Sequence, residues 1–171
     1  MDEATLSESI SFQGPSPFIP LKSVRIELAP STTPGIMFEV RGRQAQYRIA
    51  NTRGNQALNG ARYLKVYVQD KKVRVPEHLL SALFCAQITN VRIICNQGEV
   101  PVCGPGSKAF YEEIQRRRTE TGRRVRQASV CRESIYMGET KGIRGSVRVT
   151  PSQKLEICVL SGKQHDLVDI Q

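Results

Sequence analysis

The sequence predicts an α+β fold in which a layer of β-sheet packs against helices, with an incomplete second sheet attached. Three observations support this prediction. Short segments that alternate polar and apolar residues recur along the chain, as expected of half-buried strands. Two segments, 76–86 and 108–118, have the composition of helices, and a strand lies between them. A further run of strand-like segments follows residue 127.

The N-terminal third is predicted to begin irregularly and then to form strands. Prolines cluster in residues 1–22, so this segment is expected to lack regular structure. Residues 23–30 alternate in polarity and residues 36–42 are strand-like, and Pro34 and Gly35 between them indicate a turn. The two segments are therefore expected to form a hairpin.

The middle of the chain is predicted to contain more strands before the first helix. Residues 46–51 are expected to form a third strand, and the Gly- and Asn-rich residues 52–61 a loop. Residues 62–75 supply one or two strands, with a possible turn at Gln69-Asp70-Lys71.

The helices are the clearest elements. A proline at position 76 suits a first helical turn, because its missing N–H costs nothing there. The apolar face of this helix is expected to consist of Leu79, Leu80, Leu83 and Phe84. Residues 90–96 are predicted to be a strand. The second helix, 108–118, ends in basic residues that complement its macrodipole.

The domain organisation follows from a basic stretch. We predict a first domain at 1–118, a basic linker at 119–127 and the start of a second domain at 128–171. The chain has a net charge of +9, and much of the excess lies in Arg116–Arg126. This stretch is either a solvated helix end and linker or a face for an anionic partner. No nucleic-acid motif accompanies it, so no nucleic-acid partner is expected.

Composition narrows the class of protein. Apolar residues make up 39% and charged residues 24% of the 171 residues, as in ordinary globular proteins. No apolar run is long enough to span a membrane, and the acidic N-terminus does not resemble a signal peptide, so a cytoplasmic location is expected. The five cysteines lack CxxC spacing and are interpreted as small buried hydrophobic residues.

The chemistry is restricted by the presence of only two histidines, His78 and His165. Glu77 and His78 lie side by side where a strand is followed by a helix. The positive end of a helix favours an ionised carboxylate, which can act as a general base, and neutral imidazole suits zinc. The alternative is a structural capping role for this pair.

Residues 75–114 resemble the UDP-3-O-acyl-N-acetylglucosamine deacetylases, the zinc-dependent hydrolases of lipid A biosynthesis. The residues that match the family pattern are Val75, Glu77, His78, Leu79, Ala82, Leu83, Ile88, Asn90, Glu99, Pro101 and Phe110. Upstream, Asn51-Thr52-Arg53 resembles the family's substrate-facing loop, and residues 21–42 resemble its first strands.

The resemblance implies a two-layer sandwich with a mostly antiparallel, five-stranded sheet covered by helices. It also implies that Glu77 is the general base, that His78 binds zinc, and that Thr52, Arg53 and Asn55 bind the UDP-acyl-sugar substrate. In the family, a His-x-x-x-Asp pair on a second-domain helix completes the zinc site. At most, peripheral membrane contact is expected, because the substrate carries an acyl chain.

Departures from the family pattern lead us to expect a truncated or half enzyme. The second-domain metal helix is expected to be absent, and His165 and Asp169 have its spacing but are interpreted as a tail. Self-association, or a second chain that supplies the second domain, would complete the site. The alternatives are a non-catalytic binding or regulatory module with this fold and, less favoured, a binder of anionic polymers that uses Arg116–Arg126.

Overall fold

The structure, a computed structural model, describes residues 2–48, 52–56, 62–124, 135–137 and 147–149. The chain forms two compact units, Met1–Arg126 and Gln127–Gln171. In the second unit, β11 (Ile135–Met137) and β12 (Val147–Val149) form an antiparallel pair. No helix among the described residues is long and apolar enough to cross a membrane.

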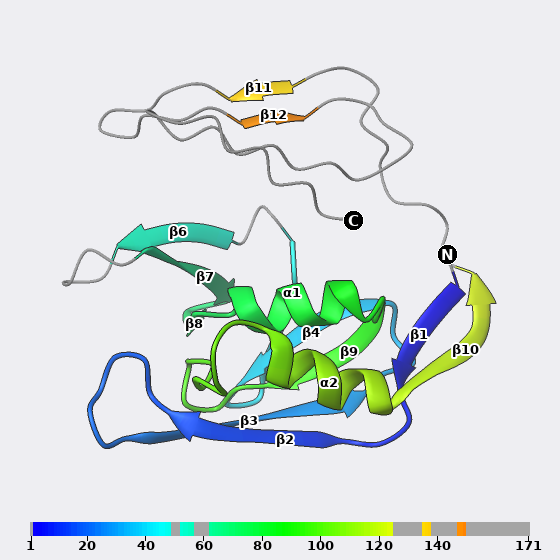
Figure 1. Cartoon of the computed structure of the whole chain (residues 1–171), viewed down its shortest axis with the longest axis horizontal. Coiled ribbons are helices and arrows are strands. Elements are labelled where there is room, and N and C mark those ends of the chain that lie inside the picture. The colour runs from blue at the N-terminus through cyan, green and yellow to red at the C-terminus, as the bar shows by residue number, and fades with distance from the viewer. Residues whose placement is uncertain (1, 49–51, 57–61, 125–134, 138–146, 150–171) are drawn as a thin grey trace. The chain divides into compact units, whose positions relative to one another are not determined.

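The first unit is built on a five-stranded sheet (Figure 1). Its strands, in spatial order, are β2 (Ile10–Pro15), β3 (Ser23–Pro30), β9 (Asn90–Ile94), β4 (Gly35–Val40) and β5 (Arg43–Gln46). Neighbouring strands are antiparallel except β4 and β9, which are parallel. Helices α1 (Glu77–Cys85) and α2 (Lys108–Arg116) lie on one face of this sheet. The predicted α+β fold, with a mostly antiparallel sheet packed against helices, is confirmed.

Two smaller antiparallel sheets accompany the main one. Strands β6 (Thr52–Gln56), β7 (Arg62–Val68) and β8 (Lys71–Arg74) form a meander in that order. Strand β1 (Asp2–Leu6) pairs with β10 (Arg118–Arg124), so the two ends of the first unit lie side by side (Figure 1). The β7–β8 hairpin, with its turn at Gln69 and Asp70, confirms the strands and turn predicted in residues 62–75.

The predicted hairpin between residues 23–30 and 36–42 is wrong, although both strands exist. Strand β9 lies between β3 and β4 and pairs with both of them. The side chain of Asn90 helps to hold this parallel pairing, because its Oδ1 accepts a hydrogen bond from the Gly35 amide at 3.2 Å. The Gly35 amide also donates to the Thr89 carbonyl at 3.1 Å.

Four other segments differ from the sequence-based predictions. Residues 1–22 contain β1 and β2, so they are not irregular throughout. The strand predicted at 46–51 is instead β5, Arg43–Gln46, and residues 49–51 lie outside the described ones. The loop predicted at 52–61 begins with β6, and residues 118–124, mostly within the predicted linker, form β10. Strands β6 and β10 are polar in sequence and are defined by their pairing with β7 and β1, respectively.

The hydrophobic core lies between the main sheet and the two helices. Alternate residues of β3 (Val24, Ile26 and Leu28) are at most 1% exposed, which confirms the half-buried strand. Helix α1 contributes Leu79, Ala82 and Leu83 to the core. The predicted apolar face is wrong for Phe84, which is 72% exposed. Phe84 follows Leu83 directly and therefore lies about 100° further around the helix.

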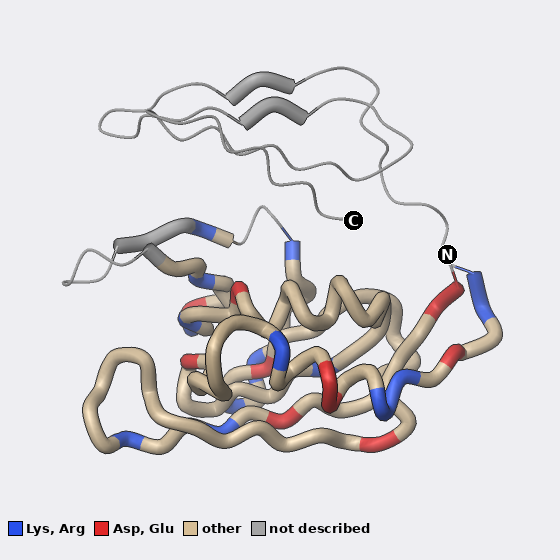
Figure 2. Tube along the Cα trace, viewed as in Figure 1, with Lys and Arg blue, Asp and Glu red and all other residues tan. Residues whose placement is uncertain are grey.

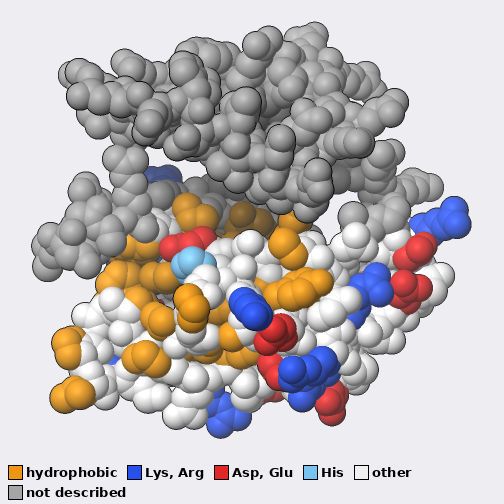
Figure 3. Space-filling view, in the orientation of Figure 1, with side chains coloured by type: hydrophobic (Ala, Val, Ile, Leu, Met, Phe, Trp, Pro, Cys, Tyr) orange, Lys and Arg blue, Asp and Glu red, His pale blue; other side chains and the backbone are white. Residues whose placement is uncertain are grey.

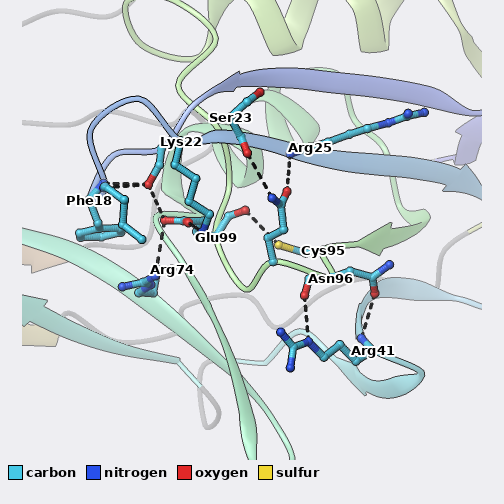
Figure 4. A network of polar contacts seen from close by, with 12 residues as sticks. Phe18, Lys22, Ser23, Arg25, Arg41, Arg74, Cys95, Asn96 and Glu99 are labelled. Atoms are coloured by element: carbon cyan, nitrogen blue, oxygen red, sulfur yellow. Dashed lines mark hydrogen bonds and ion pairs between the residues drawn. The ribbon is translucent and has the colours of Figure 1, made fainter.

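Glu99, whose carboxylate is fully buried, joins three segments of the first unit (Figure 4). Its Oε1 accepts a hydrogen bond from Lys22 Nζ at 2.5 Å, and its Oε2 accepts from Ser16 Oγ at 3.0 Å. The guanidinium of Arg74, the last residue of β8, lies 3.5 Å from the same Oε2. Glu99 therefore links the β2–β3 loop and β8 to the connection that follows β9.

Backbone contacts reinforce the junction around Glu99. The Arg74 amide donates to the Gly98 carbonyl, and the Val100 amide donates to the Arg74 carbonyl, each at 3.0 Å. The Cys95 thiol donates to the Glu99 carbonyl at 3.1 Å. Burial raises the pKa of this thiol to about 12. The carboxylate itself has Ser16, Lys22 and Arg74 as donors, as a buried charge requires.

We predict that Glu99→Ala lowers the free energy of unfolding by about 3 kcal/mol, because it leaves the charges of Lys22 and Arg74 without their buried partner. Glu120→Ala is the control, since Glu120 is 58% exposed in its ion pair with Arg118, and it should change stability by less than about 1 kcal/mol. Urea denaturation measures both variants. If both variants lost the same free energy of unfolding, the Glu99 network would contribute no more than an exposed ion pair.

The two cysteines at opposite extremes of burial should differ in reactivity. Cys85, at the end of α1, is exposed, whereas the raised pKa of Cys95 keeps that buried side chain a thiol at pH 8. Because the thiolate is the reactive form, iodoacetamide should modify Cys85 at pH 8 and leave Cys95 intact until the protein is unfolded. Site-resolved mass spectrometry, with and without denaturant, measures this. Similar native rates at both sites would contradict the described burial.

Candidate functional site

Glu77 and His78 form the first turn of α1, directly after β8. The chain reaches them through Val75, whose φ of 56° is rare for a β-branched residue. The Val75 amide donates to the Leu64 carbonyl of β7 at 3.0 Å. Local backbone strain of this kind occurs where surrounding structure over-determines a conformation, and functional sites are common examples.

The carboxylate of Glu77 is fixed from outside its own helix. Its Oε2 accepts a hydrogen bond from the Leu64 amide of β7 at 3.2 Å, and Glu77 is half-buried. The residue at the N-cap position is Pro76, and the helix has no side-chain capping hydrogen bond. The structure therefore does not favour the capping alternative, and it ties Glu77 to the neighbouring sheet.

The imidazole of His78 is exposed to solvent next to this fixed carboxylate. Figure 3 shows hydrophobic side chains gathered on the face of the first unit that carries the helices. Exposed hydrophobic residues of this unit include Phe84 of α1, Tyr111 of α2 and Val102 of the connection before α2. An accessible imidazole can bind a metal ion.

The residues predicted to bind substrate lie on β6, one strand beyond β7. Thr52 Oγ1 donates to the Arg48 carbonyl at 2.9 Å. Arg53 is exposed, and its guanidinium lies 5.8 Å from the centroid of the Tyr67 ring. The described part of Asn55 is its backbone, which pairs with Tyr63. Strand β7 thus lies between these residues and Glu77, because it pairs with β6 and its Leu64 amide donates to the Glu77 carboxylate.

A complete metal site is not found within the described residues. No three His, Cys, Asp or Glu side chains there come together in a way that could hold a metal ion. Cys95 is fully buried and its thiol donates to the Glu99 carbonyl, so it does not present its sulfur to an ion at the surface. His165 and Asp169 lie outside the described residues. His78 remains as an accessible zinc-type ligand with a carboxylate beside it.

The cysteines only partly match the prediction that they are buried. Cys95 is buried and Cys103 is half-buried, and burial raises the pKa of the Cys103 thiol. The prediction is wrong for Cys85, which is exposed at the end of α1. Cys131 and Cys158 lie outside the described residues.

The basic stretch after residue 115 is largely ion-paired where it is described. Arg116 pairs with Glu113, and Arg117 pairs with Glu113 and Glu8. The hydrogen bonds that Arg117 donates to Glu113 and Glu8 raise the pKa of its guanidinium. Figure 2 shows acidic and basic residues next to each other along β1 and β10. This pairing favours a solvated, neutralised surface over a face for an anionic polymer.

The sequence singled out Glu77 and His78 as candidates but gave no sign of the contact that positions Glu77. Leu64 contributes through its backbone amide, which leaves no trace in residue type. Glu99 matched the family pattern, but no role was predicted for it. Its signal was a charged residue directly before the apolar Val100 and Pro101.

Comparison with known proteins gives two matches. The family model described as LpxC, UDP-3-O-acyl N-acetylglycosamine deacetylase, matches residues 3–171. A UDP-3-O-acyl-N-acetylglucosamine deacetylase from Chlamydia muridarum is 32% identical over 83 residues, which make up 47% of this chain and 27% of that protein. The match therefore spans about a quarter of the length of that relative. The chain belongs to the UDP-3-O-acyl N-acetylglycosamine deacetylase family.

Proposed function

We propose that this chain contributes Glu77 and His78 to a zinc-dependent site that removes acetate from UDP-3-O-acyl-N-acetylglucosamine. The observation that carries the proposal is the Glu77–His78 pair at the start of α1, with the carboxylate held by the Leu64 amide at 3.2 Å. Family membership supports deacetylase chemistry for such a pair. The proposal places the reaction in the cytoplasm, with at most peripheral membrane contact.

The reaction is the hydrolysis of an amide bond. Glu77 takes a proton from the attacking water, whose oxygen bonds to the acetyl carbon. The C–N bond then breaks, and the nitrogen leaves as a free amine once it has gained a proton. The hydrogen bond from Leu64 orients the carboxylate for this role and restricts its rotation.

His78 is the proposed zinc ligand on this chain. Zinc, when bound, supplies a Lewis acid that polarises the acetyl carbonyl group. Catalytic zinc is normally held by three protein ligands, and the described residues provide one evident ligand. The remaining ligands would come from parts of the protein outside the described residues, or from a second chain.

A non-catalytic module is the second candidate. The observation that favours it is the lack of a complete metal-ligand set among the described residues. Such a module would bind the sugar nucleotide without cleaving it, so binding and hydrolysis have to be measured separately.

We predict different effects from the two adjacent residues. His78→Ala should lose both bound zinc and deacetylase activity. Glu77→Gln should keep its zinc but lose about 10²- to 10⁴-fold in kcat, because only the general base is removed. Zinc is measured by elemental analysis after dialysis, and activity by acetate release from the UDP-acyl-sugar.

His165→Ala is made for comparison with the histidine substitution: retained zinc and activity are expected if His165 belongs to a tail, and loss of zinc would make it a second ligand. If the unmodified protein binds the sugar nucleotide but holds no zinc and releases no acetate, the non-catalytic module is correct. Zinc retained by His78→Ala would contradict the proposed ligand.

The substrate-binding role of β6 can be tested separately. Arg53→Ala should raise KM for the UDP-acyl-sugar by about tenfold and leave kcat nearly unchanged, because a contact made equally in the ground and transition states affects binding alone. Steady-state kinetics measures the two constants. Arg123→Ala, which removes an exposed arginine from β10, should change neither. A fall in kcat without a change in KM would contradict a binding role for Arg53.

A further inference from the structure

Three turns that are distant in sequence converge at one end of the first unit. They are the β4–β5 turn at Arg41 and Gly42, the β7–β8 turn at Gln69 and Asp70, and the turn after β9 at 96–98. The Arg41 amide donates to Asn96 Oδ1 at 2.9 Å, and Arg43 Nη1 donates to Gln69 Oε1 at 3.0 Å. These hydrogen bonds hold the turns in fixed relative positions.

The turns enclose an open pocket of about 430 Å³, here named the three-turn pocket. Its volume lies within the range of about 300–1,000 Å³ that is typical of small-molecule sites. The residues that line it include Arg41, Asp70, Lys71, Lys72, Arg74 and Asn96. Neither Glu77 nor His78 lines the pocket, so it is separate from the proposed catalytic pair.

The lining of the three-turn pocket is strongly cationic. It has four basic side chains, Arg41, Lys71, Lys72 and Arg74, and a single carboxylate, Asp70. Asp70 is already neutralised, because Arg43 Nε lies 3.0 Å and Lys71 Nζ 2.8 Å from its oxygens. The hydrogen bond from Lys71 is the main cause of its lowered pKa.

Two of the cations remain without a compensating charge. The Arg74 guanidinium is engaged by Glu99 at 3.5 Å. Arg41 donates from Nε to the Asn96 carbonyl at 3.3 Å, but no carboxylate within the described ranges pairs with Arg41 or with Lys72. Unpaired cations at a polar pocket attract a compact anion, and phosphate groups are the usual biological choice.

We propose that the three-turn pocket binds a phosphate or diphosphate group through Lys72 and Arg41. The side-chain amide of Asn96 is a further donor, because its oxygen is occupied by the Arg41 amide. Such a group occurs both in free diphosphates and in phospholipid headgroups, and the pocket chemistry suits either source. The proposal does not depend on zinc or on deacetylase activity.

The test is titration calorimetry of the purified protein with pyrophosphate at low ionic strength. Vesicles of phosphatidylglycerol, with phosphatidylcholine vesicles for comparison, are tested in parallel by co-sedimentation. The variants are Lys72→Gln, Arg41→Gln and the double substitution. Arg123→Gln is the matched control, because it removes the same charge from an exposed site on β10 outside the pocket.

Each single variant should weaken pyrophosphate binding by about three- to fivefold and the double variant by about tenfold, as expected for partly exposed charges. Arg123→Gln should have no effect. If only phosphatidylglycerol vesicles bind, and the same variants reduce that binding, the ligand is a lipid headgroup. The proposal is overturned if neither ligand binds, or if Arg123→Gln weakens binding as much as Lys72→Gln.

Discussion

The ion-pair network of Glu99 is the constraint on which the arrangement of the first unit depends. A fully buried carboxylate is unfavourable unless cations and donors surround it, and Lys22, Ser16 and Arg74 meet this requirement from two separate segments. The network therefore fixes the β2–β3 loop and the end of β8 against the connection after β9. Because Arg74 is three residues before Glu77, the same contacts position the chain just before α1.

Strand β8 connects the two functional regions that we infer. Its first residues, Lys71 and Lys72, line the three-turn pocket, and its last residue, Arg74, binds Glu99 and lies just before the Glu77–His78 pair. Strand β8 thus contributes to the cationic pocket and leads, after two intervening residues, into the helix that carries the proposed general base. The residues of the Glu99 network hold the segments of the first unit together. In contrast, His78, Lys72 and Arg41 are exposed, add little to the core and remain available for ligands.

The sequence predicted the elements whose side chains show a clear period, including residues 23–30 and the helix that begins at Glu77. It did not predict their pairing, because β9 is inserted between β3 and β4 from more than fifty residues away. Strand β10 was missed because its residues are polar and gain strand structure only beside β1. The Glu77–His78 pair was visible as adjacent residues, but the three-turn pocket was not, since its cations come from separate turns.

The central claim, that Glu99 holds the junction before α1, is tested most directly by hydrogen–deuterium exchange of Glu99→Gln and the unmodified protein. This substitution keeps the shape of the side chain and removes its charge. The account predicts faster exchange at residues 16–22, 74–77 and 98–102, with unchanged exchange in the β1–β10 pair. Unchanged protection at the Val75 and Val100 amides, or a uniform increase throughout the first unit, would contradict it.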